Sequence, residues 1–228
     1  MSDTEQGLIW ITGASLGIGR ALALHMAGAG WRVAASARGA EALADLAAQN
    51  PRIHAFPLDI TEPGAAEAAL AAIEAQLGPV SVAVLNAGTY LPDPVDAVDL
   101  AGLERMTDLN LIGTVRSLEP VAARMVARGA GRIAVVSSVA GIVGLPGAAG
   151  YAATKAALLA YCEAMQPGLA RAGVRLQVIN PGFVDTPLTR KNTFPMPFLI
   201  PADRAAAIIA RGLASNRYEI TFPRPMAL

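Results

Sequence analysis

The stretch LIWITGASLGIG, residues 8–19, decides the fold of this chain. The apolar run over residues 8–12 predicts a buried strand, a glycine-rich turn follows, and apolar residues recur at helical spacing from Ile18 to about Ala29. In such a unit, glycines let a diphosphate approach the backbone N–H groups at the helix N-terminus. A tight turn without a ligand is the alternative, but its place after the first strand favours nucleotide binding.

The glycines of this turn follow the spacing Gly-x-x-x-Gly-x-Gly, whereas the commonest dinucleotide fingerprint is Gly-x-Gly-x-x-Gly. The turn supplies the first group of expected cofactor-binding residues, namely Gly13, Ser15, Leu16, Gly17, Ile18 and Gly19.

Apolar runs and helical patterns alternate along the rest of the chain, which predicts βαβ units with right-handed crossovers and a parallel sheet. No linker-like stretch interrupts the 228 residues. We therefore expect an α/β fold, a single doubly wound Rossmann-type domain over residues 1–228 with about seven strands and helices on both faces. The further predicted strands are 32–37, 53–58, 80–85, 131–138, 175–180 and 218–222, and the helices are 40–50, 62–77, 99–128 as one helix or a broken pair, 151–172 and 201–215.

Charge and composition narrow the class of function. With 18 basic and 18 acidic residues and no basic run, the chain offers no electrostatic support for binding nucleic acid. The single cysteine, Cys162, is expected to be buried filler, and the opening residues 1–6 lack the pattern of a signal peptide, so we expect a cytoplasmic protein. His25 and His54 lack acidic or cysteine partners at ligand spacing, so no metal site is predicted.

An uncharged run over residues 133–154 is long enough to span a membrane. It contains several glycines and a proline, which indicate a strand followed by a loop. We therefore predict no membrane span.

Tyr151 lies near the end of this run, and Lys155 follows the run directly, four residues after Tyr151. On a helix, residues at that spacing share one face. A free tyrosine ionises near pH ~10, and an adjacent cation stabilises the phenolate and lowers that pKa. Tyr151 would then exchange a proton with a substrate oxygen, although such a pair also arises by chance on amphipathic helices.

Arg38 stands at the end of the second predicted strand, where an acidic residue normally holds the ribose 2'-hydroxyl of NAD. A guanidinium offers forked donors to a phosphate instead. Arg38 therefore favours NADP over NAD, and a solvated surface arginine is the alternative.

Taken together, the motifs resemble those of the short-chain dehydrogenase/reductases of about 250 residues, in order and spacing over nearly the whole chain. The residues that carry this resemblance are Gly13, Gly17 and Gly19, Asn86-Ala87-Gly88, Asn110, Ser138, Tyr151 with Lys155, and Pro181-Gly182 with Thr186.

The resemblance implies a role for each polar residue of the catalytic group. Tyr151 would be the general acid/base, and Lys155 would lower its pKa while binding the nicotinamide ribose. Ser138 would hold the substrate oxygen. Asn110 would hold a water that links Lys155 to solvent; an exposed helix asparagine is the alternative.

The resemblance also implies further cofactor contacts. Asp59 would lie near the adenine, with a helix cap or turn residue as its alternative role. Asn86 and its neighbours would lie beside the cofactor, or simply form a turn, and the stretch from Pro181 would close over the nicotinamide. These expected contacts are Asp59, Ile60, Asn86, Ala87, Gly88, Pro181, Gly182, Val184 and Thr186, together with Tyr151 and Lys155.

The sequence thus predicts an NADP(H)-dependent oxidoreductase that interconverts a small-molecule carbonyl and an alcohol. The alternative is an NADP(H)-binding redox sensor without turnover. Residues 186–201 fit no regular element and predict either a lid over an apolar substrate or a packed surface loop. Alanines between residues 152 and 160 give the predicted helix a small-residue surface, which the resemblance assigns to a homodimer or homotetramer interface.

Overall fold

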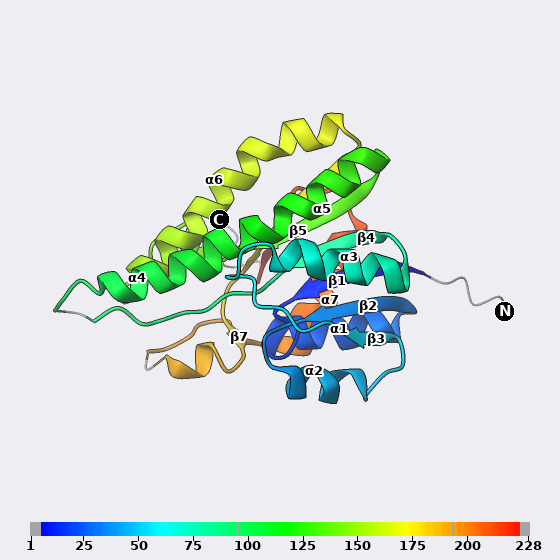
Figure 1. Ribbon diagram of the computed structural model, residues 1–228. Coiled ribbons are helices and arrows are strands. Elements are labelled where there is room, and N and C mark those ends of the chain that lie inside the picture. Colours follow the sequence, from blue (N-terminus) through cyan, green and yellow to red (C-terminus); the bar gives the residue numbers. More distant parts are fainter. Residues whose placement is uncertain (1–5, 95, 193, 224–228) are drawn as a thin grey trace.

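The computed structural model describes residues 6–94, 96–192 and 194–223 (Figure 1). The opening residues 1–5, on which the expectation about a signal peptide rests, and Thr193 of the predicted lid lie outside the described residues.

A seven-stranded sheet in the order β3-β2-β1-β4-β5-β6-β9 forms the centre of the molecule, and every neighbouring pair is parallel. This arrangement confirms the predicted doubly wound sheet. The chain order reverses between β1 and β4, which opens a crevice at the carboxyl ends of the strands. The strands are β1 (Gln6–Thr12), β2 (Trp31–Ser36), β3 (Ile53–Ala55), β4 (Val80–Leu85), β5 (Gly131–Val136), β6 (Val174–Pro181) and β9 (Glu219–Phe222).

Helices cover both faces of the sheet (Figure 1). One layer contains α1 (Gly17–Gly28) and α7 (Ala202–Ala214), with α2 (Ala40–Ala47) beside β2 and β3. The opposite layer contains α3 (Ala65–Leu77), α5 (Thr114–Arg128) and α6 (Ala149–Arg171), and α4 (Leu100–Met106) extends it. None of the described helices is long and apolar enough to cross a membrane.

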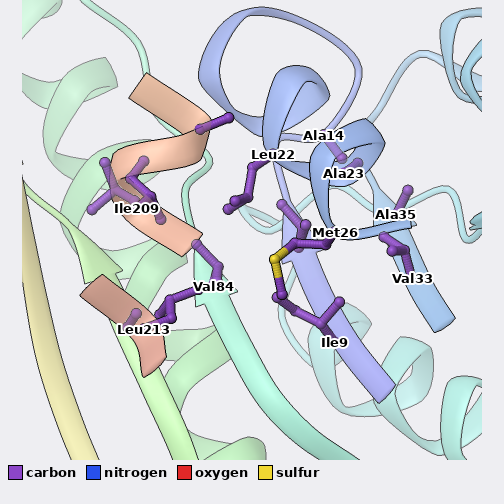
Figure 2. Close-up of a cluster of buried hydrophobic side chains, with 14 of the residues drawn as sticks. Ile9, Ala14, Leu22, Ala23, Met26, Val33, Ala35, Val84, Ile209 and Leu213 are labelled. Atoms are coloured by element: carbon purple, nitrogen blue, oxygen red, sulfur yellow. The ribbon is translucent and has the colours of Figure 1, made fainter. Parts of the chain in front are cut away.

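Strand β1 shows why both layers form. Ile9 and Ile11 pack with α1 and α7, in the cluster that Figure 2 shows, while Leu8 and Trp10 face the opposite layer. All four are fully buried. Because side chains alternate along a strand, an uninterrupted apolar run buries both faces of the sheet, as a parallel sheet between two helical layers requires.

Several boundaries differ from the prediction, most of them by one to three residues. β3 ends at Ala55 instead of residue 58, although the N–H groups of Phe56 and Leu58 still bond to the carbonyls of Ala35 and Ala37 (2.9 and 3.0 Å). The proline between them does not break these bonds, because an N–H at its position would face the open edge of the sheet. Helix α3 begins at Ala65 instead of residue 62, because the preceding glycine has a left-handed backbone.

Of residues 99–128, predicted as one helix or a broken pair, those from 100 to 128 are helical throughout, but the winding changes in the middle. Between α4 and α5 lies a π-helical segment, Thr107–Gly113. Asp99 caps the start of α4 by accepting a hydrogen bond from the Gly102 N–H (2.9 Å).

The expectation that residues 186–201 contain no regular element is wrong. The segment includes a 3₁₀ turn, Thr189–Lys191, and ends in β8 (Ile200–Pro201), which pairs in parallel with β7 (Val184–Asp185). Both ends of the segment are therefore tied together beside the carboxyl ends of the main strands.

Candidate active site

A cavity of about 590 Å³ lies at the carboxyl ends of β1, β2, β4, β5 and β6. It brings together all the predicted cofactor-binding residues except Gly19, together with the predicted catalytic residues Ser138, Tyr151 and Lys155. Asn110 does not line it. Lining residues that sequence reasoning did not assign are Thr12, Ser36, Ala37, Gly39, Ala42, Leu58, Leu109, Val136, Ser137, Pro187, Leu188, Thr189 and Lys191.

The glycine turn between β1 and α1 needs its glycines for two reasons. Gly13 and Gly17 have positive φ angles (66° and 55°), which other residues rarely adopt. A Cβ on Gly19 would lie 2.3 Å from the carbonyl oxygen of Gly13, so this residue allows the helix to pack on the turn and is not part of the cavity wall. Helix α1 has no side-chain cap and no acidic residue in its first turn, which leaves its first N–H groups available to an anion.

Asn86, at the end of β4, joins this turn to the neighbouring strand. Its side-chain amide donates to the carbonyls of Thr12 and Gly13 (3.1 and 3.2 Å). The Thr12 hydroxyl in turn accepts from the N–H groups of Asn86 and Ala87 (3.0 and 3.2 Å). Asn86 therefore joins the ends of β1 and β4, which lie on either side of the crevice. Sequence reasoning did not identify Thr12, which completes this contact.

Arg38 and Asp59 lie at the end of the cavity formed by β2. The Arg38 side chain is 69% exposed and lies 3.9 Å from an Asp59 carboxylate oxygen. Asp59 also accepts hydrogen bonds from the N–H and hydroxyl of Thr61 (3.0 and 2.7 Å), which is the turn role weighed as its alternative. Burial tends to raise the pKa of Asp59, but these bonds and the Arg38 charge outweigh it and hold the pKa below its ordinary value.

Tyr151 and Lys155 project from successive turns of α6. Lys155 is only 3% exposed, and its ammonium lies 5.7 Å from the centre of the Tyr151 ring and donates to the carbonyl of Val136 (2.9 Å). This is the one hydrogen bond of the ammonium to the described residues. Two of its three N–H groups therefore remain available to a ligand in the cavity.

Ser138 follows β5 and faces the same space. Its hydroxyl accepts from the Ala140 N–H (3.1 Å) and donates to the Pro181 carbonyl across a long 3.4 Å. It also lies near enough to the Tyr151 phenol to lower the pKa of that group. Because the bond to Pro181 is weak, the serine proton can turn toward a substrate oxygen at little cost.

Asn110 lies in the π-helical segment and is completely buried. Its side chain accepts from the N–H of Thr89 (2.7 Å) and donates to the carbonyl of Thr89 (2.9 Å) and the hydroxyl of Thr154 (3.1 Å). The alternative of an exposed helix asparagine is therefore wrong. Asn110 ties the segment after β4 to α6, one residue before Lys155.

The segment from Pro181 to Lys191 closes one side of the cavity. The Gly182 N–H bonds to the Phe222 carbonyl in β9 (2.7 Å). A Cβ placed on Gly17 would lie 3.1 Å from the Thr186 methyl group, so this segment packs directly on the glycine turn.

These features fit a dinucleotide: free N–H groups at a helix N-terminus, glycines that admit a close ligand, and a buried ammonium with spare donors. The sequence matches the family model for short chain dehydrogenases over residues 8–195. The chain belongs to the short-chain dehydrogenase/reductase family. It is therefore an oxidoreductase of the hydride-transferring kind, and members of this family bind nicotinamide cofactors.

Known relatives agree with this assignment. An uncharacterized oxidoreductase of Myxococcus xanthus is 36% identical over 232 residues, covering 100% of this chain and 92% of that protein. The 3-ketoacyl-(acyl-carrier-protein) reductase of Brucella melitensis, solved with NADH, has a TM-score of 0.86 at 25% identity, with 95% of each chain covered. A short-chain dehydrogenase of Sphingobium yanoikuyae, solved with NADPH, has a TM-score of 0.84 at 27% identity, covering 96% of this chain and 89% of its own.

The electrostatics of this short-chain dehydrogenase depart from the expectation about Tyr151. Burial raises its pKa to about 12, the nearby Ser138 hydroxyl opposes the rise, and the neighbouring Tyr90 adds to it. Burial also lowers the pKa of Lys155 to about 8. The expected lowering of the tyrosine pKa by Lys155 is therefore absent here, because the loss of hydration dominates the pKa of each group.

Tyr90 is a neighbour of Tyr151 that sequence reasoning missed. The two rings meet edge to face with centres 5.4 Å apart, and the Tyr90 hydroxyl donates to the Gly147 carbonyl (3.1 Å). Three residues further on, Asp93 accepts from the Gly150 N–H at the start of α6 (3.2 Å). Through Tyr90 and Asp93, the segment after β4 thus holds the start of α6 in place. In the sequence, only the position of Tyr90 after the Asn86 motif could have suggested that it lies beside Tyr151.

Proposed function

We propose that this protein is an NADP(H)-dependent reductase that converts a carbonyl to an alcohol, with Tyr151 as the proton donor. One observation carries the proposal: Ser138, Tyr151 and Lys155 meet in the cavity that the glycine turn of β1 opens into. Cofactor binding and catalysis would then share one domain over residues 1–228.

When bound in this cavity, a nicotinamide cofactor would supply the hydride for the carbonyl carbon. Tyr151 and Ser138 hold the carbonyl oxygen between their hydroxyl groups, and Tyr151 gives it a proton as negative charge develops there. The spare N–H groups of Lys155 bind the cofactor ribose. Asn110 fixes the segment at Thr89, which follows Gly88 in the cavity wall. A water held near Asn110 would link Lys155 to solvent.

The raised pKa of Tyr151 keeps its phenol protonated, as proton donation to a carbonyl oxygen requires. A phenol with a pKa of about 12 carries its proton throughout the neutral range, so it is ready to act as an acid. Alcohol oxidation would need the phenolate instead, which burial disfavours.

Arg38 supports NADP as the preferred cofactor. Its guanidinium lines the cavity at the end of β2, is largely exposed, and meets Asp59 only at 3.9 Å, so it can bind a 2'-phosphate. Relatives solved with NADH and with NADPH both exist. We expect Arg38→Asp to weaken NADPH binding by about 10-fold or more while sparing NADH, as measured by cofactor fluorescence. An unchanged preference between NADPH and NADH would show that Arg38 does not bind the 2'-phosphate.

The substrate would be a small carbonyl compound, and apolar residues of the predicted lid suggest an apolar one. Phe194, Phe198 and Leu199 are exposed on this segment, and the Phe194 ring lies 6.0 Å from that of Phe183. The Brucella melitensis relative is named for a 3-ketoacyl substrate, which makes thioester-linked ketones a sensible class to include.

The test is to mix the protein with NADPH and a panel of aldehydes, ketones, quinones and 3-ketoacyl thioesters and to follow the loss of reduced-cofactor absorbance. We expect turnover on at least one class, with longer apolar chains favoured. Tight NADPH binding with no turnover on any of them would contradict the proposal and favour a redox sensor.

Two further expectations belong to the proposal. The family resemblance favours a homodimer or homotetramer, and Ala153, Ala156 and Ala160 are exposed along α6, where a second subunit could pack. A cytoplasmic location remains a prediction from the sequence.

A further inference from the structure

Lysine is rare in this chain and confined to one place. Lys155 and Lys191 are its only lysines, and every other basic residue except histidine is an arginine. Both lysines line the cofactor cavity, although they come from different elements and lie 36 positions apart in the sequence. The mechanism above uses Lys155 and gives Lys191 no role.

The segment that carries Lys191 is held firmly against the glycine turn. Thr186 packs on Gly17, as described above, and the Thr189 hydroxyl donates to the Val184 carbonyl (2.5 Å) and accepts from the Thr186 N–H (3.1 Å). Lys191 is the last residue of the short turn that begins at Thr189. The turn that carries Lys191 is therefore held in place at the cavity by Thr186 and Thr189.

The neighbouring cation, Arg190, already has an ion-pair partner outside the cavity. Arg190 pairs with Asp185 (2.8 Å) and faces a second groove, outside the cofactor cavity. Lys191, by contrast, is exposed and makes no hydrogen bond or ion pair with the described residues. Its ammonium is therefore free to bind an anion in the cavity.

Among the residues that the structure describes, three cations line the cavity, each in a different part of it. Arg38 lies at the end of β2 beside Asp59, and Lys155 is buried beside Tyr151. Lys191 belongs to the segment that packs on the glycine turn, where the first N–H groups of α1 await an anion. The anion expected there is the diphosphate that both nicotinamide cofactors share.

We propose that Lys191 binds the diphosphate of the cofactor and completes the site formed by the glycine turn. This inference deepens the proposed function and rests on cofactor binding, but not on turnover or on NADP preference. An exposed ammonium meeting a doubly charged diphosphate should strengthen binding about 5- to 10-fold at low salt, and less as salt screens the charges.

The first test is the dissociation constant of NADPH, NADH and ADP-ribose for the wild type and Lys191→Met. We expect all three ligands to bind about 5- to 10-fold more weakly to the variant, by the same factor, with Lys191→Arg restoring most of the affinity. The matched control is Arg211→Met, which removes an exposed cation of α7 that does not line the cavity. It should leave all three constants unchanged.

Other outcomes would overturn the proposal. Unchanged affinities would show that Lys191 does not meet the cofactor, a loss confined to NADPH would assign it to the 2'-phosphate, and a change only in the substrate KM would assign it to the substrate. If the wild type bound no cofactor at all, the proposed function would fail together with this inference, whereas normal wild-type binding separates the two.

A second test uses the scarcity of lysine in the wild-type protein. An amine-reactive reagent followed by peptide mass spectrometry should label exposed Lys191 much faster than buried Lys155. We expect saturating ADP-ribose to slow labelling of Lys191 at least 5-fold. Equal labelling with and without ADP-ribose would contradict a contact with the diphosphate.

Discussion

Lys155 illustrates how a single residue can cost stability for the sake of a site. Its ammonium is almost fully buried with one hydrogen bond to the described residues, and burial lowers its pKa to about 8. A charged group in such a place is stabilised less than it is in water. Its retention is understandable if the spare N–H groups bind a ligand.

Replacing Lys155 by methionine should reveal this cost as a pH dependence. The folded protein holds the lysine proton less tightly than the unfolded chain does, because the folded pKa is about 8 against 10.5. Wild-type stability should therefore rise relative to Lys155→Met as the pH increases through this window, by about 2 kcal/mol between pH 7 and pH 9.5. Urea unfolding of both proteins at the two pH values measures the difference.

Tyr151 and Cys162 also have raised pKa values, but both groups are present in the two proteins, so the comparison largely cancels their effects. A wild-type stability that fell relative to the variant over this range would show that Lys155 is stabilised as a cation in the fold.

Several residues of the candidate active site could be predicted from the sequence, and others could not. Tyr151 and Lys155 follow from helical spacing, and Ser138 from the family resemblance, because each lies in or beside a regular element. Tyr90 and Lys191 could not be found, since their positions depend on how irregular segments fold back onto the site. No local sequence pattern specifies which irregular segment packs back against the site.

At the scale of elements, the π-helical segment Thr107–Gly113 is the least predictable feature. The sequence predicts a helix here, but the wider winding is associated with contacts outside the helix: Asn110 bonds to both backbone groups of Thr89. Gly113 ends the segment where a Cβ would lie 2.8 Å from Ile60. Such windings often occur at functional sites.

Asn110→Leu should therefore be strongly destabilising. The substitution keeps the size of the side chain but leaves both partly buried backbone groups of Thr89 without their partners, at a cost of about 2–4 kcal/mol. Thr154→Val is the graded control, because it removes only one of the three Asn110 side-chain bonds and should cost less than about 1.5 kcal/mol.

Urea unfolding followed by circular dichroism measures both variants. If Asn110→Leu cost no more than Thr154→Val, the bonds to Thr89 would not be the reason for burying an amide in this segment.

The β7–β8 pairing shows a second limit at this scale. Val184 and Ile200 lie opposite each other in two-residue strands, too short for alternation to be visible in the sequence. Prolines around residue 196 correctly indicated an irregular path, but not that its two ends would pair.

At the scale of the whole molecule, the sheet was the most predictable part. Strands buried on both faces give uninterrupted apolar runs, and their alternation with amphipathic helices permits few topologies. The reversal of strand order between β1 and β4 then creates the crevice where the cavity lies. The substrate, in contrast, depends on side chains of the segment before β8, which the overall topology does not determine.

Cofactor binding should stabilise the whole molecule. NADPH at 100 times its dissociation constant should add about 2.7 kcal/mol, which for a domain of this size corresponds to a rise in Tm of about 5–10 °C. NADH at the same concentration should give a smaller rise, because Arg38 has no 2'-phosphate to bind. Differential scanning fluorimetry measures both, and an absence of any shift would contradict a dinucleotide site in the cavity.

The most direct test of the central claim is the Tyr151→Phe variant, assayed on the best substrate of the carbonyl panel. The substitution removes the proton donor and keeps the ring that packs edge to face on Tyr90. We predict a loss of kcat of at least about 10³-fold with the NADPH dissociation constant changed less than about 3-fold. A variant that kept most of its turnover while binding cofactor normally would contradict the assignment of Tyr151 as the proton donor.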